Sequence, residues 1–469
     1  MQIRYLVITT SALVRAAAEI IYIKFLFFMT SFKMAQAAPH VSILLSGDRV
    51  PSSFFSRNSL LLCSNICHTS ETKREKIVSL SHILYIGMGL FAKLPTSDVG
   101  DLALLHLQGD AQPPDTTEMR ASCLPAEWFP QSGVQLTWPH AGTDWKPRLR
   151  EVTDCYLRLA YEISTDETLL IVTPEPDALR RLLQEKLPRR CNDRIQLIEC
   201  PTNDTWARDH GFITVLSQEG AQLLDFQFNG WGNKFPSSLD NAINRHVYAS
   251  GILRGHYTDC LDMVLEGGSI ESDGRGTLLT TASCLLSPNR NPALNQPAIE
   301  ERLCHLLQCR RILWLHHGQL EGDDTDGHID TLARLCPGDT IAYVSCSDSR
   351  DSHYEQLKAL ETELQAFRTL EDKPYRLVPL PLPDPVYDET TGERLPATYA
   401  NFLILNHKIL LPTYAQPDKD KQAHDAMQRL FPKLSIIDID SRILISQHGS
   451  IHCATMQFPQ GVVQHTRQL

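Results

Sequence analysis

Four polar clusters in this sequence carry the residue types that perform nucleophilic and acid–base chemistry. Each cluster interrupts a run of apolar residues, a position at which loops present reactive groups on a rigid scaffold. A common site requires the fold to bring together segments that lie far apart in the chain. The clusters are residues 203–211 (NDTWARDHG), 265–269 (LEGGS), 321–330 (EGDDTDGHID) and 447–457 (QHGSIHCATMQ).

The last cluster offers a candidate nucleophile, Cys453, with His452 as its neighbour in the sequence. A cysteine in an electropositive, partly accessible environment reacts as its thiolate. The competing interpretation is a small buried apolar residue, the commoner fate of a free cysteine. We expect an extended backbone here, on which the side chains of Cys453 and His452 point in opposite directions.

The 321–330 cluster resembles a calcium-binding loop without matching its spacing. Gly327 comes too early after the acidic residues, and no glutamate stands at the twelfth position. His328 has no second histidine or cysteine at the spacing of a zinc site. We therefore expect no metal ion, and His328 remains as a candidate acid–base group.

The other two clusters supply carboxylates, and each also has a simpler structural interpretation. Asp204 and Asp209 flank Arg208 and could form only an ion pair with it. Glu266 precedes two glycines, which allow another backbone or a ligand to approach closely but are also typical of a β-bulge.

Together these residues indicate one kind of reaction. Several carboxylates, one histidine and one cysteine without a metal set suit nucleophilic attack on the carbon of a planar cation. A guanidinium group meets this description, because its N–H groups pair bidentately with carboxylates. Attack on its carbon requires a strong, soft nucleophile such as a thiolate.

The elements that must position these residues become regular after residue 119, where the order strand, polar loop, strand, helix, strand recurs about five times. Strand 168–173, for example, precedes an amphipathic helix over 178–187, and residues 262–270 and 276–281 are expected to form a hairpin. This order predicts an α/β repeat architecture. Neither a dinucleotide-binding glycine fingerprint nor a Walker loop is present, so nothing supports nucleotide binding.

Residues 1–118 show no sustained helical or strand period, and we expect a disordered or poorly packed N-terminal extension to a domain over residues 119–469. The apolar segment 6–29 carries three charged residues, and a charge at the centre of a spanning helix costs about 2.5 to 3.5 kcal/mol. We therefore expect no membrane-spanning helix. An alternative is that residues 1–37 act as a signal peptide for export.

The composition limits the classes of partner and the cellular compartments that are expected for this protein. The chain has 469 residues, of which 55 are acidic and 44 basic, giving a formal net charge of -11. It holds no long lysine or arginine run to neutralise phosphates, so we expect no nucleic-acid partner. Thirteen cysteines without the dense spacing of a disulfide framework predict reduced thiols and a cytoplasmic location.

At this point the chain resembles the agmatine deiminase and bacterial-type peptidylarginine deiminase family, over about residues 123 to 460. Any one of the shared motifs is weak, but their number and order are specific. They are LPAEW at 124–128, TWPH at 137–140, the 203–211 block, FNGWG at 228–232, the 265–269 block, LSPNRN at 286–291, GHID at 327–330, YAN at 399–401 and IHC at 451–453.

The resemblance implies a five-bladed α/β propeller, the pentein fold, with the active site where the loops of the blades converge. It also assigns roles. Cys453 would be the nucleophile and His328 the general acid and base, with Asp209 and Asp330 as the carboxylates that bind the guanidinium. Asn401 would orient substrate or water, Trp206 and Trp231 would wall the alkyl chain, and Glu266 would organise the site from contact or just behind it. No metal or organic cofactor is implied.

The substrate is expected to be a small guanidino cation. An enzyme that reads the carboxylate of arginine needs a guanidinium of its own, whereas residues 225–235 offer Lys234 but no arginine. Agmatine, which lacks that carboxylate, is therefore favoured, and Asp204 and Asp324 could meet its distal ammonium together with the neighbouring Asp323 and Asp326. The resemblance then implies hydrolysis to N-carbamoylputrescine and ammonia, through a thiouronium on the cysteine, in putrescine and polyamine metabolism.

Other functions stay open at this point. They are a protein-arginine deiminase, a metal-dependent amidino hydrolase and a non-catalytic binding propeller, and a homo-oligomer is also possible. The chain departs from the family pattern in its loops, at Phe212, Asn233 and His448. His448 takes a place in what is usually a run of glycines before the nucleophile.

Overall fold

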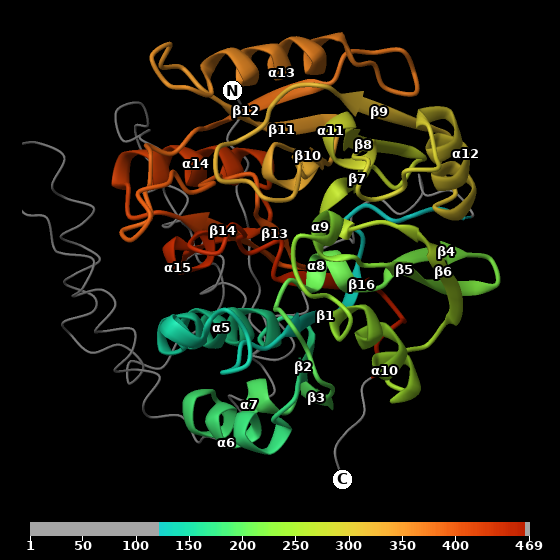
Figure 1. Ribbon diagram of the computed structural model, residues 1–469, viewed down its shortest axis with the longest axis vertical. Helices are drawn as coiled ribbons and strands as arrows, with labels where there is room; N and C mark the ends of the chain where they lie inside the picture. The colour runs from blue at the N-terminus through green and yellow to red at the C-terminus, as the bar shows by residue number, and fades with distance from the viewer. Residues whose placement is uncertain (1–121, 465–469) are drawn as a thin grey trace, which may run out of the picture. The chain divides into compact units, whose positions relative to one another are not determined.

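The computed structural model describes residues 122–464 (Figure 1). The predictions for residues 1–118, the alternative of a signal peptide over 1–37 and the apolar segment 6–29 lie outside these residues. Among the residues described, no helix combines the length and the apolar character needed to cross a membrane.

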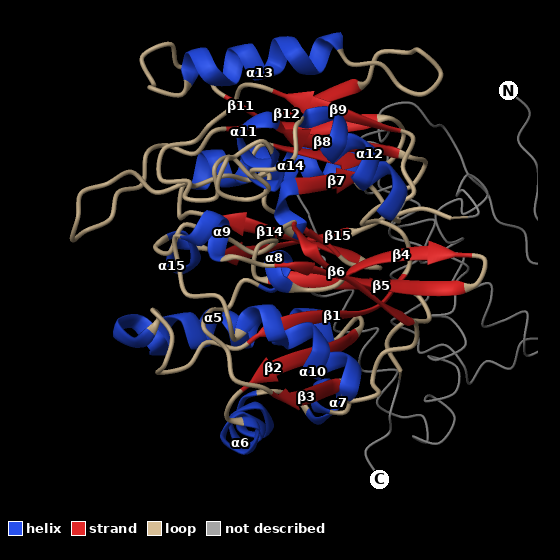
Figure 2. Cartoon of the chain, turned by 45° about the vertical axis from the view of Figure 1, so that its right-hand side comes forward, coloured by secondary structure: helices blue, strands red, loops and turns tan. Residues whose placement is uncertain are grey.

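Five small sheets follow one another along the described chain, and each contains an antiparallel pair joined to a parallel strand (Figures 1 and 2). Four of them have three strands in chain order, with the second strand antiparallel to the first and parallel to the third. Their strands are β4 (Ile213–Ser217), β5 (Gly220–Gln227) and β6 (His256–Val264); β7 (Ile270–Ser272), β8 (Thr277–Thr281) and β9 (Arg311–Leu315); β10 (Ala333–Cys336), β11 (Thr340–Ser345) and β12 (Arg376–Pro381); β13 (Leu403–Ile404), β14 (Lys408–Thr413) and β15 (Ser435–Asp440).

The remaining sheet joins segments from both ends of the described chain, in the order β16-β1-β2-β3. Its strands are β1 (Gln131–Thr137), β2 (Thr168–Thr173), β3 (Ile195–Glu199) and β16 (Thr455–Pro459). Strand β16 runs antiparallel to β1, with Gln135 opposite Met456. Because Cys453 stands just before β16, this pairing fixes the candidate nucleophile beside the start of the domain.

Helices connect the second and third strands of each unit, as parallel pairing requires. They are α5 (Leu149–Ser164) in the first sheet, then α10 (Ile243–Ala249), α11 (Ala282–Leu285) with α12 (Gln296–Leu306), α13 (Tyr354–Ala366) and α14 (Pro417–Leu430), while α6 (Pro176–Lys186) and α7 (Arg189–Asn192) lead to β3. In α5, Val152, Tyr156, Leu159 and Ile163 recur at helical spacing and are all buried against the sheet. The predicted α/β class is confirmed, whereas closure of the five sheets into a propeller stays a prediction.

The expected hairpin is correct only in its second half. Strand β6 ends at Val264, residues 267–269 form a 3₁₀ turn, and only Ile270–Ser272 pair with β8. A Cβ on Gly267 would lie 2.2 Å from the carbonyl oxygen of Arg208, so the chain turns here to pass close to another backbone. Glu266 consequently lies in a connection rather than inside a strand.

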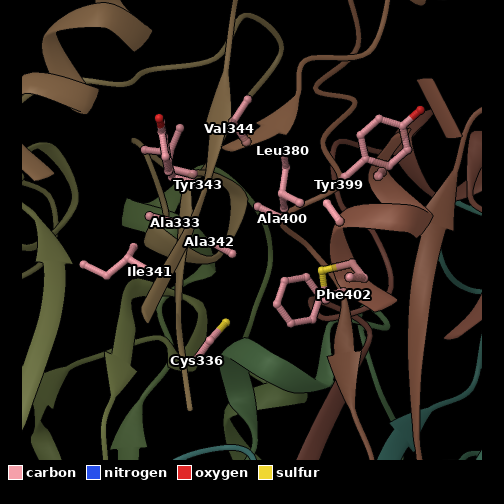
Figure 3. Packing of buried hydrophobic residues seen from close by; sticks show 14 of the residues in the cluster. Ala333, Cys336, Ile341, Ala342, Tyr343, Val344, Leu380, Tyr399, Ala400 and Phe402 are labelled. Carbon is pink, nitrogen blue, oxygen red and sulfur yellow. The ribbon is translucent and has the colours of Figure 1, made fainter. Parts of the chain in front are cut away.

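The largest hydrophobic core packs β10, β11 and residues 399–402 together (Figure 3). Within it, Ala342, Tyr399 and Phe402 are almost completely buried. The guanidinium of Arg334 lies 4.5 Å from the centre of the Phe402 ring, which is cation–π distance. A charged group thus enters the core, and it does so directly behind the candidate site.

Candidate active site

The candidate nucleophile lies in a turn between α15 (Arg442–Ile445) and β16 and is 6% exposed. The side-chain oxygen of Asn401 accepts hydrogen bonds from the backbone nitrogens of His452 (3.0 Å) and Cys453 (3.2 Å). Its amide nitrogen lies 3.2 Å from Cys453 Sγ. Asn401 therefore fixes the turn and the sulfur, and the expected extended backbone at this position is wrong.

Asp209 lies on the short helix α8 (Ala207–His210), and both of its oxygens have donors. Oδ2 accepts from Trp231 Nε1 and Oδ1 from the backbone nitrogen of Gly268, each at 3.0 Å. His328 Nδ1 stands 3.7 Å from Oδ1. Trp231 adopts a left-handed backbone (φ 54), which is uncommon for a non-glycine residue.

Asp330, in the 3₁₀ turn Ile329–Thr331, is fully buried. Its Oδ2 lies 2.8 Å from His452 Nδ1 and 3.7 Å from Cys453 Sγ. Its Oδ1 is buried without a hydrogen-bond partner among the described residues, as are both ring nitrogens of His328. The unpartnered carboxylate oxygen of Asp330 suits a ligand that brings its own N–H donors.

Gly268 shows how closely these groups converge. A Cβ at this glycine would lie 2.6 Å from His328 Nδ1, 2.8 Å from Asp209 Oδ1 and 3.2 Å from Asp330 Oδ2. The fold thus gathers the imidazole and the two carboxylates around one backbone position, and Asp330 connects them to the sulfur of Cys453.

Glu266 and Cys284 lie behind His328, and the ligand atoms of all three lie within 4.8 Å of one another. Arg290 Nε donates to both oxygens of Glu266, at 3.0 and 2.9 Å. A divalent cation would meet a carboxylate that an arginine already neutralises, so this donor set does not fit a metal. The same holds for a second cluster of Glu127, Glu271 and His452, because Arg334 binds both glutamates.

A cavity of about 200 Å³ reaches Cys453 and Asp209. Trp206 and Trp231 form part of its wall. Its acidic lining residues besides Asp209 are Asp144, Asp204 and Asp324, and among the described lining residues there is no lysine or arginine.

The three aspartates that precede His328 make different contacts. Asp323 accepts from the backbone nitrogens of Thr325 (3.0 Å) and Gly327 (2.6 Å) and so stabilises the loop itself. Asp326 pairs with Lys234 (2.7 Å) and Arg290 (2.6 Å). Asp324 alone of the three lines the cavity.

Lys234 is bound by two residues of the acidic loop. Its Nζ donates to Asp326 and, at 2.5 Å, to the carbonyl oxygen of Asp324. The lysine that the sequence offered as a carboxylate receptor is thus held by the acidic loop.

Burial and charge set the protonation of the site. Burial raises the pKa of Asp209 to about 6, and burial together with Asp330 and Asp209 raises the pKa of the Cys453 thiol well above its ordinary value. Burial alone would lower the pKa of His328, but Asp209 and Cys284 more than offset it and raise that pKa well above the ordinary value. The free protein therefore holds a neutral thiol beside an imidazolium.

The fold and this cluster define an α/β protein with a buried cysteine, histidine and carboxylate site at the end of an acidic, aromatic cavity. Residues 123–459 match the family described as Porphyromonas-type peptidyl-arginine deiminase, and the chain belongs to this family. The resemblance drawn from the motifs is thereby confirmed.

Relatives and solved structures agree with this assignment. A Marinomonas sp. (strain MWYL1) protein, provisionally named agmatine deiminase, is 33% identical over 72% of this chain and 94% of its own. A Porphyromonas gingivalis structure, provisionally named arginine deiminase, is 48% identical with a TM-score of 0.69 and covers 73% of this chain and 100% of its own. The C. jejuni agmatine deiminase with substrate bound is 35% identical with a TM-score of 0.67, over 72% and 97%.

Some residues at the site had no role in the sequence predictions. Glu127 stands in the 124–128 motif, which carried the resemblance but suggested no chemistry. Cys284 and Asp144 have no sequence signal, because only the fold places them beside His328 and in the cavity wall. His452 was set aside as pointing away from Cys453, whereas both side chains reach the same oxygen of Asp330.

Proposed function

We propose that this protein is a hydrolase of the C–N bond of a guanidino substrate, which converts agmatine to N-carbamoylputrescine and ammonia. The observation that carries the proposal is the cavity, which ends at Cys453 and Asp209 and carries carboxylates but no cationic side chain among its described lining residues. The names of relatives such as the C. jejuni agmatine deiminase support the same substrate class.

In the bound complex, Asp209 and Asp330 hold the guanidinium by charge-assisted hydrogen bonds, with Asp330 Oδ1 as a ready acceptor. The rings of Trp206 and Trp231 pack along the alkyl chain. Asp204 and Asp324 receive the distal ammonium. Burial raises the pKa of Asp204 to about 8, and an arriving cation favours its ionised form.

In the first half-reaction, the sulfur of Cys453 forms a bond to the guanidinium carbon and a C–N bond breaks. The bound cation beside the thiol offsets the two carboxylates that hold it protonated, so the thiol gives up its proton as it attacks. His328 delivers a proton to the departing nitrogen. The departing nitrogen takes this proton together with the one that the thiol lost, so it leaves as ammonium. A positively charged thiouronium remains on Cys453, and His328 is left neutral.

In the second half-reaction, water adds to the thiouronium carbon and the C–S bond breaks. His328 accepts the proton that this step releases, which restores the imidazolium, and the sulfur regains a proton as the thiol. The net change is guanidinium plus water to a ureido product plus ammonium. A positioned acid–base group of this kind contributes about 10² to 10⁴-fold.

The substrate is tested with agmatine, arginine and a peptide ending in arginine, with ammonia release as the readout. We expect the largest kcat/KM for agmatine, because Lys234 is held by Asp326 and the cavity offers an ammonium three acidic side chains besides Asp209. Turnover of the peptide alone would overturn the small-molecule substrate and favour a protein-arginine deiminase.

We also propose that the five sheets close about one axis as a five-bladed propeller. The shared order of strands in the five units and the pairing of β16 with β1 support this closure.

We further propose a role in polyamine metabolism in the cytoplasm. The proposed substrate supports the metabolic role, and the eleven free cysteines of the described residues support the compartment. Fractionation with antibody detection tests the compartment.

A further inference from the structure

The imidazole of His452 lies between two buried carboxylates. Its Nδ1 is 2.8 Å from Asp330 Oδ2, and its Nε2 is 2.8 Å from Glu127 Oε2. The side chain is 1% exposed. Its backbone is fixed as well, because Asn401 accepts from its nitrogen and Arg208 donates to its carbonyl oxygen.

These two contacts determine the charge of the ring. Ionised carboxylate oxygens only accept hydrogen bonds, and a neutral imidazole has a single N–H to donate. Arg334 Nη2 also lies 3.1 Å from Nε2, and it binds the same oxygen of Glu127, so the two nitrogens share that acceptor. A ring that meets a carboxylate oxygen at both nitrogens donates from both, and this is the imidazolium form.

The charges around the ring agree with this form. Arg334, fully buried, binds Glu127, Glu271 and the carbonyl oxygens of Ala400 and Phe402. Buried charges must be paired to be tolerated. Arg334 contacts two of the carboxylates, Glu127 and Glu271, and a positive His452 supplies the cation in contact with the third, Asp330.

We propose that His452 is a positioning residue, a buried imidazolium that keeps Asp330 ionised and aims its free oxygen at the substrate guanidinium. The inference rests on the proposed function for the identity of that substrate. Both ring nitrogens of His452 are occupied, by Asp330 and by Glu127, so it acts through Asp330 rather than on the reacting atoms.

The surroundings of Asp330 show why such a cation is needed. The charged or titratable groups that face it are His452, His328, Asp209, Cys453 and, at longer range, Arg208 and Arg334. Burial by itself would raise the pKa of Asp330. The positive charges of His452, His328 and Arg334 outweigh burial, so the pKa of Asp330 lies below its ordinary value. Of these groups, His452 alone has a charge-assisted hydrogen bond to the carboxylate.

The back of the ring has room that makes a substitution feasible. A second cavity of about 60 Å³ is lined by Glu127, Arg208, Glu271 and His452. A polar space of this size holds one or two water molecules. Glu127 can therefore be solvated when the ring is replaced, so His452→Gln has a route to a folded protein.

The test is the pH dependence of kcat/KM for agmatine in His452→Gln, with Glu271→Gln as the matched control. Loss of a cation in contact with a buried carboxylate raises its pKa by about 1 to 3 units. In H452Q the acid limb should move up in pH and steepen, because Asp330 now titrates together with Asp209. E271Q removes a negative charge from the same cluster and should not move the limb upward.

A uniform loss of kcat/KM at every pH in H452Q, with the acid limb of the profile at its wild-type pH, would overturn the inference.

A second measurement, which does not depend on turnover, separates failure of this inference from failure of the proposed function. In wild-type protein labelled with ¹⁵N-histidine, both ring nitrogens of His452 should carry protons at pH 7. A neutral ring at pH 7 would refute the fixed charge even if agmatine is not the substrate. H452Q assigns the resonances, or Asp330→Asn does so if H452Q fails to fold.

Discussion

Cys453 combines a buried, neutral thiol with two carboxylates, which is an arrangement that suppresses reaction in the free protein. In the proposed reaction, the guanidinium itself would bring the charge that activates the sulfur. Such a nucleophile would discriminate against molecules that lack a cation, since they leave the thiol protonated. The selectivity of the proposed reaction would then come from Asp209 and Asp330, the carboxylates proposed to bind the substrate.

Cys453→Ser should lower kcat by about 10⁴-fold or more, because a serine hydroxyl stays protonated without a strong base. Ammonia release measures the loss, and mass spectrometry should find no covalent adduct. Cys260→Ser is the control: this cysteine is buried in β6, away from the site, and its replacement should leave turnover intact. Residual turnover near the wild-type rate would contradict the role of the sulfur.

Gly268→Ala adds one carbon atom at the point where His328, Asp209 and Asp330 lie closest together, so it tests whether their positions matter for activity. The new methyl group would stand 2.6 Å from His328 Nδ1 and 2.8 Å from Asp209 Oδ1, so at least one of them must move. Misplacement of about 1 Å costs on the order of 10²-fold, and kcat/KM should fall by at least that much.

The matched control is Gly142→Ala, whose Cβ would meet only the side chain of His140. It should keep wild-type kcat/KM. Equal activity of the two variants would mean that the imidazole and carboxylates tolerate displacement, and the geometry assigned to the site would be wrong.

At the scale of elements, His448 ties the turn that carries the nucleophile to the acidic loop. Its Nδ1 lies 2.7 Å from the carbonyl oxygen of Gly322, and its backbone adopts the left-handed region with φ 65. A non-glycine residue in this region is strained by about 1 kcal/mol or more. The histidine therefore stands where a glycine would be easier, and its contact positions the loop of Asp324.

His448→Gly should raise KM for agmatine by about 2 to 12-fold with little change in kcat, which is the effect of losing one hydrogen bond of 0.5 to 1.5 kcal/mol in binding. Thermal stability should stay level, because glycine relieves the backbone strain. Steady-state kinetics and calorimetry measure both. A fall in kcat with unchanged KM would place His448 in the chemistry instead.

A comparison of the predicted helices and strands with the observed ones shows which parts of the fold the sequence predicts. Helices such as α5 and buried strands such as β2 follow from apolar spacing, and the motifs name the reactive residues. The turn at Gly267 and Gly268 was misassigned to a strand, because its cause is the close approach of Arg208 from another unit. The roles of Asp323, Asp324 and Asp326 differ only through contacts that the fold creates, so no local pattern separates them.

For the whole molecule, buried carboxylates predict a loss of stability toward alkaline pH. Burial raises the pKa of Glu167 and of Asp204 to about 8, and that of Asp240 to about 7, above the unfolded values of about 3.9 to 4.3. Between these limits the folded protein retains protons that the unfolded chain releases, so stability falls as pH rises. His210, with its pKa lowered by burial to about 3, acts oppositely but only below about pH 6.5.

The melting temperature should therefore decline from pH 6.5 to 8.5, as calorimetry can measure. Asp240→Asn should flatten part of this decline, since asparagine can still accept the hydrogen bonds from the backbone nitrogens of Asn203 and Asp204. A melting temperature that rises over this interval would show that the buried acids are already ionised.

The sheet built from β16 and β1 has a consequence for synthesis of the protein. Cys453 and strand β16 emerge from the ribosome after His328, Asp209, Asp330 and all six parallel strand pairs. A nascent or prematurely terminated chain therefore lacks the candidate nucleophile even when all the other strands have been made. The candidate active site can be complete only after β16, the last described strand, pairs with β1, the first.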